Sequence, residues 1–271
     1  MELDLAFDGL PAWERWRDDN PWATDPSHVS RIVESAQRFG IVSPFLGPIP
    51  ADRIQVLDRN YRETFRARGF SPRLRAVLDH LALMPETADP YAVRIYAPEA
   101  MSPFALALRG RFPFFVGSEY FPNPETRRSM PLVPHEDLGR LSFPDASFDI
   151  AVCNEVFEHV PDLSAVFAEV ARVLRPGGTL LATFPFAYNQ FHAIVKAELR
   201  DGAVHLLCDP EYHSNPLDPR GSLVYQIPGW DALELARKQG FAHAEKRFIV
   251  STSRGICGAE IAGIFMMRAV R

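Results

Sequence analysis

The sequence has little cysteine, and none of it forms a recognisable metal or redox motif. Cys153, Cys208 and Cys257 lie far apart, and there is no CxxC pair. The chain also lacks an apolar run of the roughly 20 residues that a membrane span needs. The first residues, MELDLAFDGL, carry acidic side chains where a secretory signal has basic ones. We therefore expect a cytoplasmic protein with reduced thiols and no membrane partner.

An excess of basic residues is missing as well. Lys and Arg number 29 against 34 Asp and Glu, which gives a formal net charge of −5. Because nucleic-acid surfaces depend on clustered basic side chains, we expect no nucleic-acid partner. One local run departs from this balance, and we interpret it as an exposed helix face, with an anion site as the alternative: Arg62, Arg66, Arg68, Arg73 and Arg75.

The first 88 residues carry helix signals and no convincing strand, so they predict a helical N-terminal extension. Asp25-Pro26 and Ser71-Pro72 each place a capping side chain before a proline at the first helical position. Gly40 is a suitable C-terminal end for the first of these helices. Three tryptophans are expected to pack the extension onto the rest of the chain, with a ligand pocket as the alternative: Trp13, Trp16 and Trp22.

From residue 89 onward, short apolar runs alternate with helical patterns. Strands are expected at 92–97, 114–119, 148–154 and 179–184, and helices at 102–110 and 163–174. A helix at 229–241 and two closing strands within 244–270 follow, and the last strand of such a pair can run antiparallel to the rest. This alternation is typical of βαβ units around a mostly parallel sheet. We therefore predict one α/β domain over residues 89–271.

A series of short motifs lies between Asp137 and Phe184. It consists of an acid, Leu-x-Phe-x-Asp at 141–145, Phe-Asp at 148–149, Glu-His-Val-Pro-Asp at 158–162 and Leu-Arg-Pro-Gly-Gly at 174–178. In order and spacing these motifs resemble the class I S-adenosylmethionine-dependent methyltransferases. The resemblance implies a Rossmann-like fold with a mostly parallel seven-stranded sheet and an antiparallel last strand. It also implies S-adenosylmethionine as cofactor, bound at the carboxyl ends of the strands.

The resemblance further assigns individual residues to this cofactor. Glu119 matches the acid that binds the ribose hydroxyls, and Asp137 matches the acid that accepts from the adenine amino group. Leu138 would place its backbone N–H near the adenine ring, and Asn154 would face the methionine part. The expected cofactor site comprises Ala97, Glu99, Glu119, Asp137, Leu138 and Asn154.

The turn after the first strand departs from the family pattern. The family has Gly-x-Gly-x-Gly there, whereas residues 98–102 read Pro-Glu-Ala-Met-Ser. The proline lacks an N–H, and the alanine and serine add side-chain atoms where the glycines leave space. The acid usual near the end of that strand aligns with Tyr96, and we hypothesise that Glu99 replaces it opposite the methionine ammonium. Either this loop admits the cofactor in another shape, or the site has lost it.

The same turn, with Gly-Ser-Glu-Tyr at 117–120, is similar to a methyltransferase-like branch whose members often accompany glycan-assembly genes. We therefore expect the methyl acceptor to be a small molecule or a saccharide. Residues 185–229 are too long for an ordinary connection and predict a lid over the acceptor, with a purely structural loop as the alternative. We expect Tyr188, His192 and Tyr212 to contact the acceptor.

Methyl transfer to oxygen or nitrogen benefits from a base whose pKa is near neutral, and histidine is the natural choice. His213, in the lid, is the first candidate and His159 the second. Glu155 and His159 are four residues apart, with Glu158 adjacent, as metal ligands on one helical turn could be. No metal is expected, because no third ligand is apparent at a diagnostic spacing.

The leading interpretation is a biosynthetic methyltransferase acting on a small-molecule or saccharide acceptor. One alternative is a catalytically silent methyltransferase-like subunit that binds an enzyme partner. Another is an enzyme of the same fold with non-methylating chemistry. The sequence leaves the oligomeric state open, a homodimer included.

Overall fold

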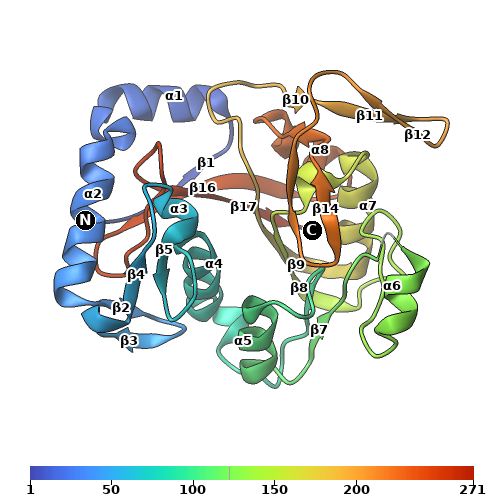
Figure 1. Ribbon diagram of the computed structural model, residues 1–271, viewed down its shortest axis with the longest axis horizontal. Helices are drawn as coiled ribbons and strands as arrows, with labels where there is room; N and C mark the ends of the chain where they lie inside the picture. Colours follow the sequence, from blue (N-terminus) through green and yellow to red (C-terminus); the bar gives the residue numbers. More distant parts are fainter. Residues whose placement is uncertain (122) are drawn as a thin grey trace. The chain divides into compact units, whose positions relative to one another are not determined.

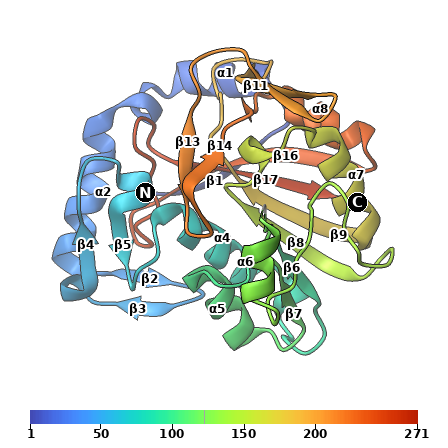
Figure 2. The same ribbon diagram turned by 45° about the vertical axis from the view of Figure 1, so that its right-hand side comes forward.

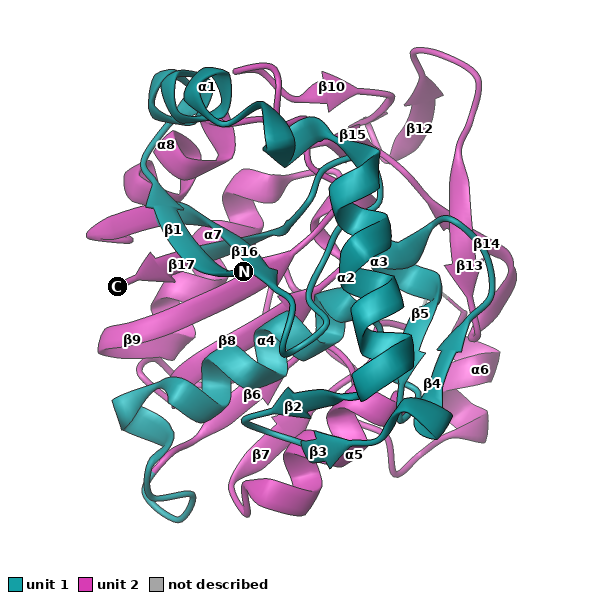
Figure 3. Cartoon of the chain, turned by 90° about the vertical axis from the view of Figure 1, so that its left-hand side faces the viewer, with its two compact units in different colours: residues 1–92, 245–267 teal, residues 93–244, 268–271 magenta. Residues whose placement is uncertain are grey.

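The fold is described from a computed structural model, which covers residues 1–121 and 123–271. The main sheet has seven strands in the order β1-β16-β17-β9-β8-β6-β7, so the predicted α/β class is confirmed. The chain divides into two compact units, coloured separately in Figure 3. The first unit contains Met1–Ala92 and Glu245–Met267, and the second contains Val93–Ala244 and Arg268–Arg271.

Four parallel strands form the centre of the second unit (Figure 1). They are β6 (Ile95–Ala97), β7 (Phe115–Gly117), β8 (Phe148–Asn154) and β9 (Leu174–Thr183). β6 lies between β7 and β8, so the chain reverses its direction across the sheet after β7. In open α/β sheets, ligands bind outside the carboxyl ends of the strands at such a reversal. A ligand-binding site is therefore expected at the carboxyl end of β6.

Helices connect these strands, and side chains cap the first turns of two of them. Ser102 accepts a hydrogen bond from the Ala105 N–H at the start of α5 (Pro103–Arg111), and Asp162 caps α7 (Leu163–Val173) in the same way. α7 contacts both β9 and α8. The remaining helical segments are α6 (Pro124–Ser129), η4 (Phe157–His159) and α8 (Asp231–Lys238).

The predicted lid segment is folded into three small antiparallel pairs. β10 (Ile194–Val195) pairs with β15 (Gln226–Ile227), and β11 (Ala197–Arg200) pairs with β12 (Ala203–Leu206). β13 (Tyr212–Asn215) pairs with β14 (Asp218–Leu223), and this hairpin is seen well in Figure 2. The segment is therefore an inserted substructure and not an irregular loop.

The first unit combines helices with short strands. Its main helices are α1 (Leu10–Asp19), α2 (Pro26–Phe39), α3 (Tyr61–Thr64) and α4 (Pro72–Leu83), joined by the 3-10 turns η1 (Pro21–Thr24), η2 (Ala51–Arg53) and η3 (Pro85–Thr87). Its strands are β1 (Glu2–Phe7), β2 (Ile41–Ser43), β3 (Gly47–Ile49), β4 (Ile54–Val56), β5 (Phe65–Ala67), β16 (His243–Ser251) and most of β17 (Ile264–Val270). The caps expected at Asp25 and Ser71 are present.

The prediction that residues 1–88 contain no strands is wrong. β1 pairs antiparallel with β16, with Leu3 opposite Val250. A six-residue strand whose partner lies at the other end of the chain has no local turn signal, so sequence periodicity alone does not reveal it. The expected division at residue 88 stays a prediction, although residues 245–267 group with the N-terminal segment.

Trp13 and Trp16 are packing residues of the first unit. Trp13 is fully buried and its ring lies 4.9 Å from that of Phe265 and 5.1 Å from that of Phe248. Trp16 also contacts Phe248. Trp22 packs edge-on against Trp16. These contacts support the packing interpretation of the tryptophans.

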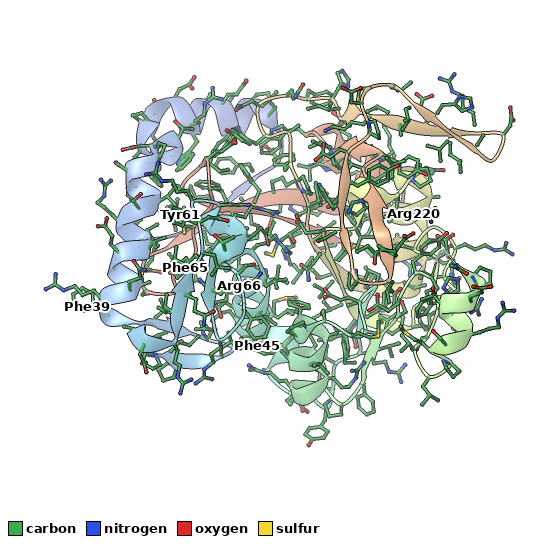
Figure 4. The ribbon with its side chains drawn as sticks, in the orientation of Figure 1. Phe39, Phe45, Tyr61, Phe65, Arg66 and Arg220 are labelled. Carbon is green, nitrogen blue, oxygen red and sulfur yellow. The ribbon has the colours of Figure 1, made fainter. Side chains whose placement is uncertain are left out.

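The arginine run does not form one exposed helix face. Its members lie on α3, β5, the following turn and α4, and Figure 4 shows Arg66 beside Phe65 on β5. Arg75 is fully buried, and its guanidinium donates to the backbone oxygens of Phe65, Phe70 and Gly255. Arg73 pairs with Glu63. Two of the five arginines therefore stabilise the core of this unit.

Across the described ranges 1–121 and 123–271, no helix has the length and apolar character to span a membrane.

Candidate functional site

A chain of polar side chains connects the carboxyl ends of three neighbouring strands. Asn154, the last residue of β8, donates from Nδ2 to Glu99 Oε1 at 2.8 Å. Its Oδ1 accepts from the Thr183 hydroxyl at the end of β9, at 3.1 Å. The predicted cofactor residues Glu99 and Asn154 are thus brought together directly after the ends of β6 and β8, and Thr183 extends the chain to β9.

The turn at residues 98–102 is ordered by its own polar side chains. The Ser102 hydroxyl donates to Glu99 Oε2 while its oxygen caps α5. Tyr96, which aligns with the family's acid, is buried, and its hydroxyl hydrogen-bonds the Ser118 hydroxyl at 2.9 Å. Burial raises the pKa of Tyr96, so this side chain stays neutral. Glu99 is therefore the carboxylate found after the end of β6, where the family has its acid at the position of Tyr96.

Glu119 lies two residues after the end of β7 and closes the turn from the other side. Its Oε1 accepts from the backbone N–H of Ala100 at 2.8 Å and of Met101 at 3.1 Å. Ala97, predicted as part of the same site, is fully buried at the end of β6. The carboxylate expected at the ribose thus serves here as the acceptor for two turn amides.

A glycine on the adjacent strand makes room for this turn. A Cβ added at Gly117 would lie 2.6 Å from the Glu99 carbonyl oxygen and 3.0 Å from Ala100 Cα. Both are backbone atoms that cannot rotate away. Gly117 therefore allows the turn to pack directly against β7.

The predicted adenine residues lie on the segment between α6 and β8. Asp137 is exposed, and its Oδ1 accepts from the Gly139 N–H at 2.9 Å. Leu138 is buried. A backbone bridge between Glu119 and His135 connects this segment to the end of β7. The arrangement leaves the Asp137 side chain at the surface, beside an apolar residue.

A second cluster lies on η4 and the β13–β14 hairpin. His159 Nε2 and His213 Nδ1 each lie 3.5 Å from Oε1 of Glu158. The two imidazole rings meet edge to face, with centroids 4.9 Å apart. Both predicted histidine candidates are therefore neighbours, although 54 positions separate them in the sequence (213 minus 159).

The outer nitrogen of each histidine also has a partner. His159 Nδ1 lies 2.9 Å from the Leu223 carbonyl oxygen, and His213 Nε2 lies 3.3 Å from Glu211 Oε1. Glu211 is in turn paired with Lys196. The pKa of His213 is raised, chiefly by its interaction with Glu158 and further by Glu211. A raised pKa leaves less of this imidazole unprotonated and able to accept a proton at neutral pH, which weakens the case for His213 as the base.

The three residues expected to bind the acceptor have contacts of other kinds. The backbone oxygen of Tyr188 accepts from the Trp230 indole N–H. His192 is 85% exposed and lies 3.5 Å from Asp231, at a separate pocket of about 300 Å³ beside α8. Tyr212 is exposed on β13, opposite Leu223. Their acceptor role stays a prediction.

Comparison with known proteins shows which family part of this chain resembles. Residues 121–182 match the family model described as a methyltransferase domain. A probable S-adenosylmethionine-dependent methyltransferase of Mycolicibacterium smegmatis is 43% identical over 53 residues, which are 20% of this chain and 21% of that protein. The 27-O-demethylrifamycin SV methyltransferase of Amycolatopsis mediterranei is 31% identical over 128 residues, which are 41% of this chain and 47% of that protein.

Among solved structures, an S-adenosylmethionine-dependent methyltransferase from Mesorhizobium loti aligns with a TM-score of 0.45 and 19% identity. The alignment covers 74% of this chain and 96% of that one. The chain spans less than half the length of the two curated relatives named above. The predicted resemblance to methyltransferases is confirmed for the matched segment, residues 121–182.

Proposed function

We propose that this protein transfers a methyl group from S-adenosylmethionine to a small-molecule or saccharide acceptor. The observation that carries the proposal is the pair of carboxylates, Glu99 and Glu119, at the turn after β6, where the strand order reverses. A cationic cofactor that also carries ribose hydroxyls suits two acceptor-only groups at such an edge. The match of residues 121–182 to a methyltransferase domain supports the same cofactor.

The residues present fit this cofactor by their donor and acceptor types. Glu99, held by Asn154, would accept from the methionine ammonium, and Glu119 would accept from the ribose. Asp137 and the Leu138 N–H would meet the adenine edge. When bound, S-adenosylmethionine supplies an activated methyl group on a sulfonium, so the protein's task is to align the acceptor with it.

The acceptor is proposed to enter beside the β13–β14 hairpin, since the segment 185–229 follows β9, next to the strand that ends at Asn154. The Amycolatopsis relative is named as a methyltransferase of 27-O-demethylrifamycin SV, which supports a small-molecule acceptor. We propose His213 and His159 as the polar groups nearest the acceptor, and Tyr188, His192 and Tyr212 as further contacts.

Ligand-dependent stabilisation tests the cofactor half of this proposal. S-adenosylmethionine and S-adenosylhomocysteine should each raise the melting temperature in a concentration-dependent way, and ATP should not. Calorimetry should then give one site per chain. If neither adenosylated ligand binds at millimolar concentration, the turn after β6 is not part of a cofactor site, and the catalytically silent subunit becomes the better interpretation. The use of Glu119 to close the turn is the feature that favours that second candidate.

Transfer itself is tested with a radiolabelled methyl donor and a panel of sugar nucleotides, free saccharides and phenolic or hydroxylated metabolites. Label that appears in any acceptor supports methyl transfer. The alternative result is that the donor binds but neither transfers its methyl group nor is consumed with any of these acceptors. That result would favour non-methylating chemistry in the same fold.

A further inference from the structure

We propose that Glu158, His159 and His213 bind one divalent transition-metal ion. This inference does not depend on methyl transfer, because it concerns the cluster on η4 and β13 and not the turn after β6. It revises the expectation of no metal, which was based on the lack of a third ligand element near Glu158 and His159. The β13–β14 hairpin supplies that ligand as His213.

The spacing of the three side chains suits a single ion. One ligand atom from each of them can be chosen so that all lie within 4.8 Å of one another. Glu158 Oε1 is 3.5 Å from His159 Nε2 and 3.5 Å from His213 Nδ1. Metal–ligand bonds of about 2.1 Å at tetrahedral angles place neighbouring ligand atoms about 3.4 Å apart. Small side-chain adjustments would therefore complete the coordination.

The Glu158 carboxylate is the independent observation that points to a cation. It is fully buried, and among the described residues neither of its oxygens has a partner with hydrogen-bonding geometry; the two imidazole nitrogens lie 3.5 Å from Oε1. A buried carboxylate without a donor is costly, and proteins normally pair it or use it to coordinate a metal. Its nearest polar neighbours are two imidazole nitrogens, which are themselves metal-binding atoms.

The outer contacts of the two histidines orient their lone pairs towards Glu158. Since the Leu223 carbonyl can only accept, His159 carries its proton on Nδ1, and Nε2 is left as a donor atom for a metal. His213 places Nε2 against Glu211, so Nδ1 faces the centre of the cluster. A ligating histidine that donates its other N–H to a carboxylate or carbonyl is the usual arrangement around a bound metal.

The donor set also indicates the class of ion. Two imidazoles and one carboxylate suit Zn²⁺, Mn²⁺, Co²⁺ or Fe²⁺, whereas Mg²⁺ and Ca²⁺ prefer oxygen ligands alone. Three protein ligands leave a coordination position for a water or an acceptor oxygen. Without a metal, the same geometry would hold a protonated His213 between Glu158 and Glu211, and this is the competing outcome.

The test uses the untagged full chain after removal of metal with a chelator. Titration with Zn²⁺ and with Mn²⁺ by calorimetry should give one site per chain, and Co²⁺ should produce a visible absorption spectrum with nitrogen ligation. Glu158→Gln and His213→Ala should each weaken binding at least 100-fold. Glu211→Gln, which alters only an outer contact, should weaken it by about 10- to 100-fold.

His205→Ala is the matched control, because His205 is an exposed histidine of the same inserted segment and should bind metal like the parent. Circular dichroism establishes whether each variant is folded. If Glu158→Gln does not fold, the weaker metal binding expected of Glu211→Gln still tests the proposal. Failure of the parent to bind any of the three ions would overturn the proposal. So would parent-like affinity in both Glu158→Gln and His213→Ala.

Discussion

Glu99 is the single side chain on which the electrostatics of the cofactor proposal depend most. It stands at the end of β6, receives the Asn154 amide and the Ser102 hydroxyl, and takes the place that buried Tyr96 cannot fill. A carboxylate with both oxygens already oriented loses little entropy when it meets a cation. Its charge, more than its shape, should therefore determine affinity for a sulfonium amino acid.

Glu99→Gln should weaken S-adenosylmethionine binding by roughly 10- to 100-fold, the loss expected when a hydrogen bond to a charged group is replaced by a neutral one. The glutamine can still accept from Asn154, so the fold should be kept. Calorimetry measures the effect, with the exposed Glu125→Gln on α6 as control. Equal affinities for parent and Glu99→Gln would remove Glu99 from the site.

At the scale of elements, the turn after β6 and the strand β7 must be considered together. The turn packs closely on Gly117, and a methyl group there would meet the Glu99 carbonyl oxygen and Ala100 Cα. Gly117→Ala should therefore shift the turn, lower cofactor affinity at least tenfold and destabilise the fold by about 1–3 kcal/mol, as overpacking does.

Gly110→Ala provides the matched comparison. Gly110 lies within α5, and an added Cβ would have nothing within 4 Å. Alanine there should stabilise the helix by about 0.5–1 kcal/mol and leave cofactor affinity unchanged. Thermal denaturation and calorimetry on both variants check the pair. A Gly117→Ala protein with parent-like stability and affinity would show that the turn is not held by this contact.

The β13–β14 hairpin also contains a glycine whose replacement should disturb a proposed site. Gly221 has φ +82°, and a Cβ there would lie 2.4 Å from the His213 carbonyl oxygen. Gly221→Ala should displace the strand that carries His213 and reduce affinity for Zn²⁺ at least tenfold. Gly202→Ala, also at positive φ but with open space around it, controls for backbone strain alone. Equal metal affinity in the two variants would contradict the proposed coupling between the hairpin and the metal site.

For the whole molecule, acid stability offers a test of the electrostatics. The Arg172 guanidinium, on α7, lowers the pKa of Glu169 below its ordinary value of 4.5. A carboxyl whose pKa is lower in the folded state adds stability above its unfolded pKa, and this is lost as pH falls through the folded value. Glu169→Gln should therefore cost about 1 kcal/mol at pH 7, a value reduced for solvent screening.

The difference between Glu169→Gln and the parent should shrink as pH falls below 4.5. Melting curves between pH 3 and pH 8 measure this, and the exposed Glu234→Gln on α8 should show no such trend. A difference that stays constant over the whole range would assign the effect to packing and not to charge.

Local patterns were sufficient for much of the fold. A capping residue followed by proline marked the starts of α2, α4 and α5, and the apolar run FDIAVCN marked β8. β1 was missed because its partner is β16, and only long-range pairing reveals it. The proximity of Glu158 and His213 was missed for the same reason, since a hairpin in the inserted segment brings them together. The closure of the turn by Glu119 depends on side-chain geometry that no spacing in the sequence encodes.

The pairing of β1 with β16, and of Arg75 with the Gly255 carbonyl, has a consequence for synthesis of the protein. The first unit lacks a strand and a core partner until residues 245–267 have left the ribosome, whereas Val93–Ala244 has most of its contacts within itself. Nascent chains generally fold domain by domain, N-terminal part first. Here the order should be reversed: residues 1–92, with Trp13 and Trp16 exposed, must wait until residues 245–267 have been made. Chaperone dependence should therefore be greater for residues 1–92 than for residues 93–244.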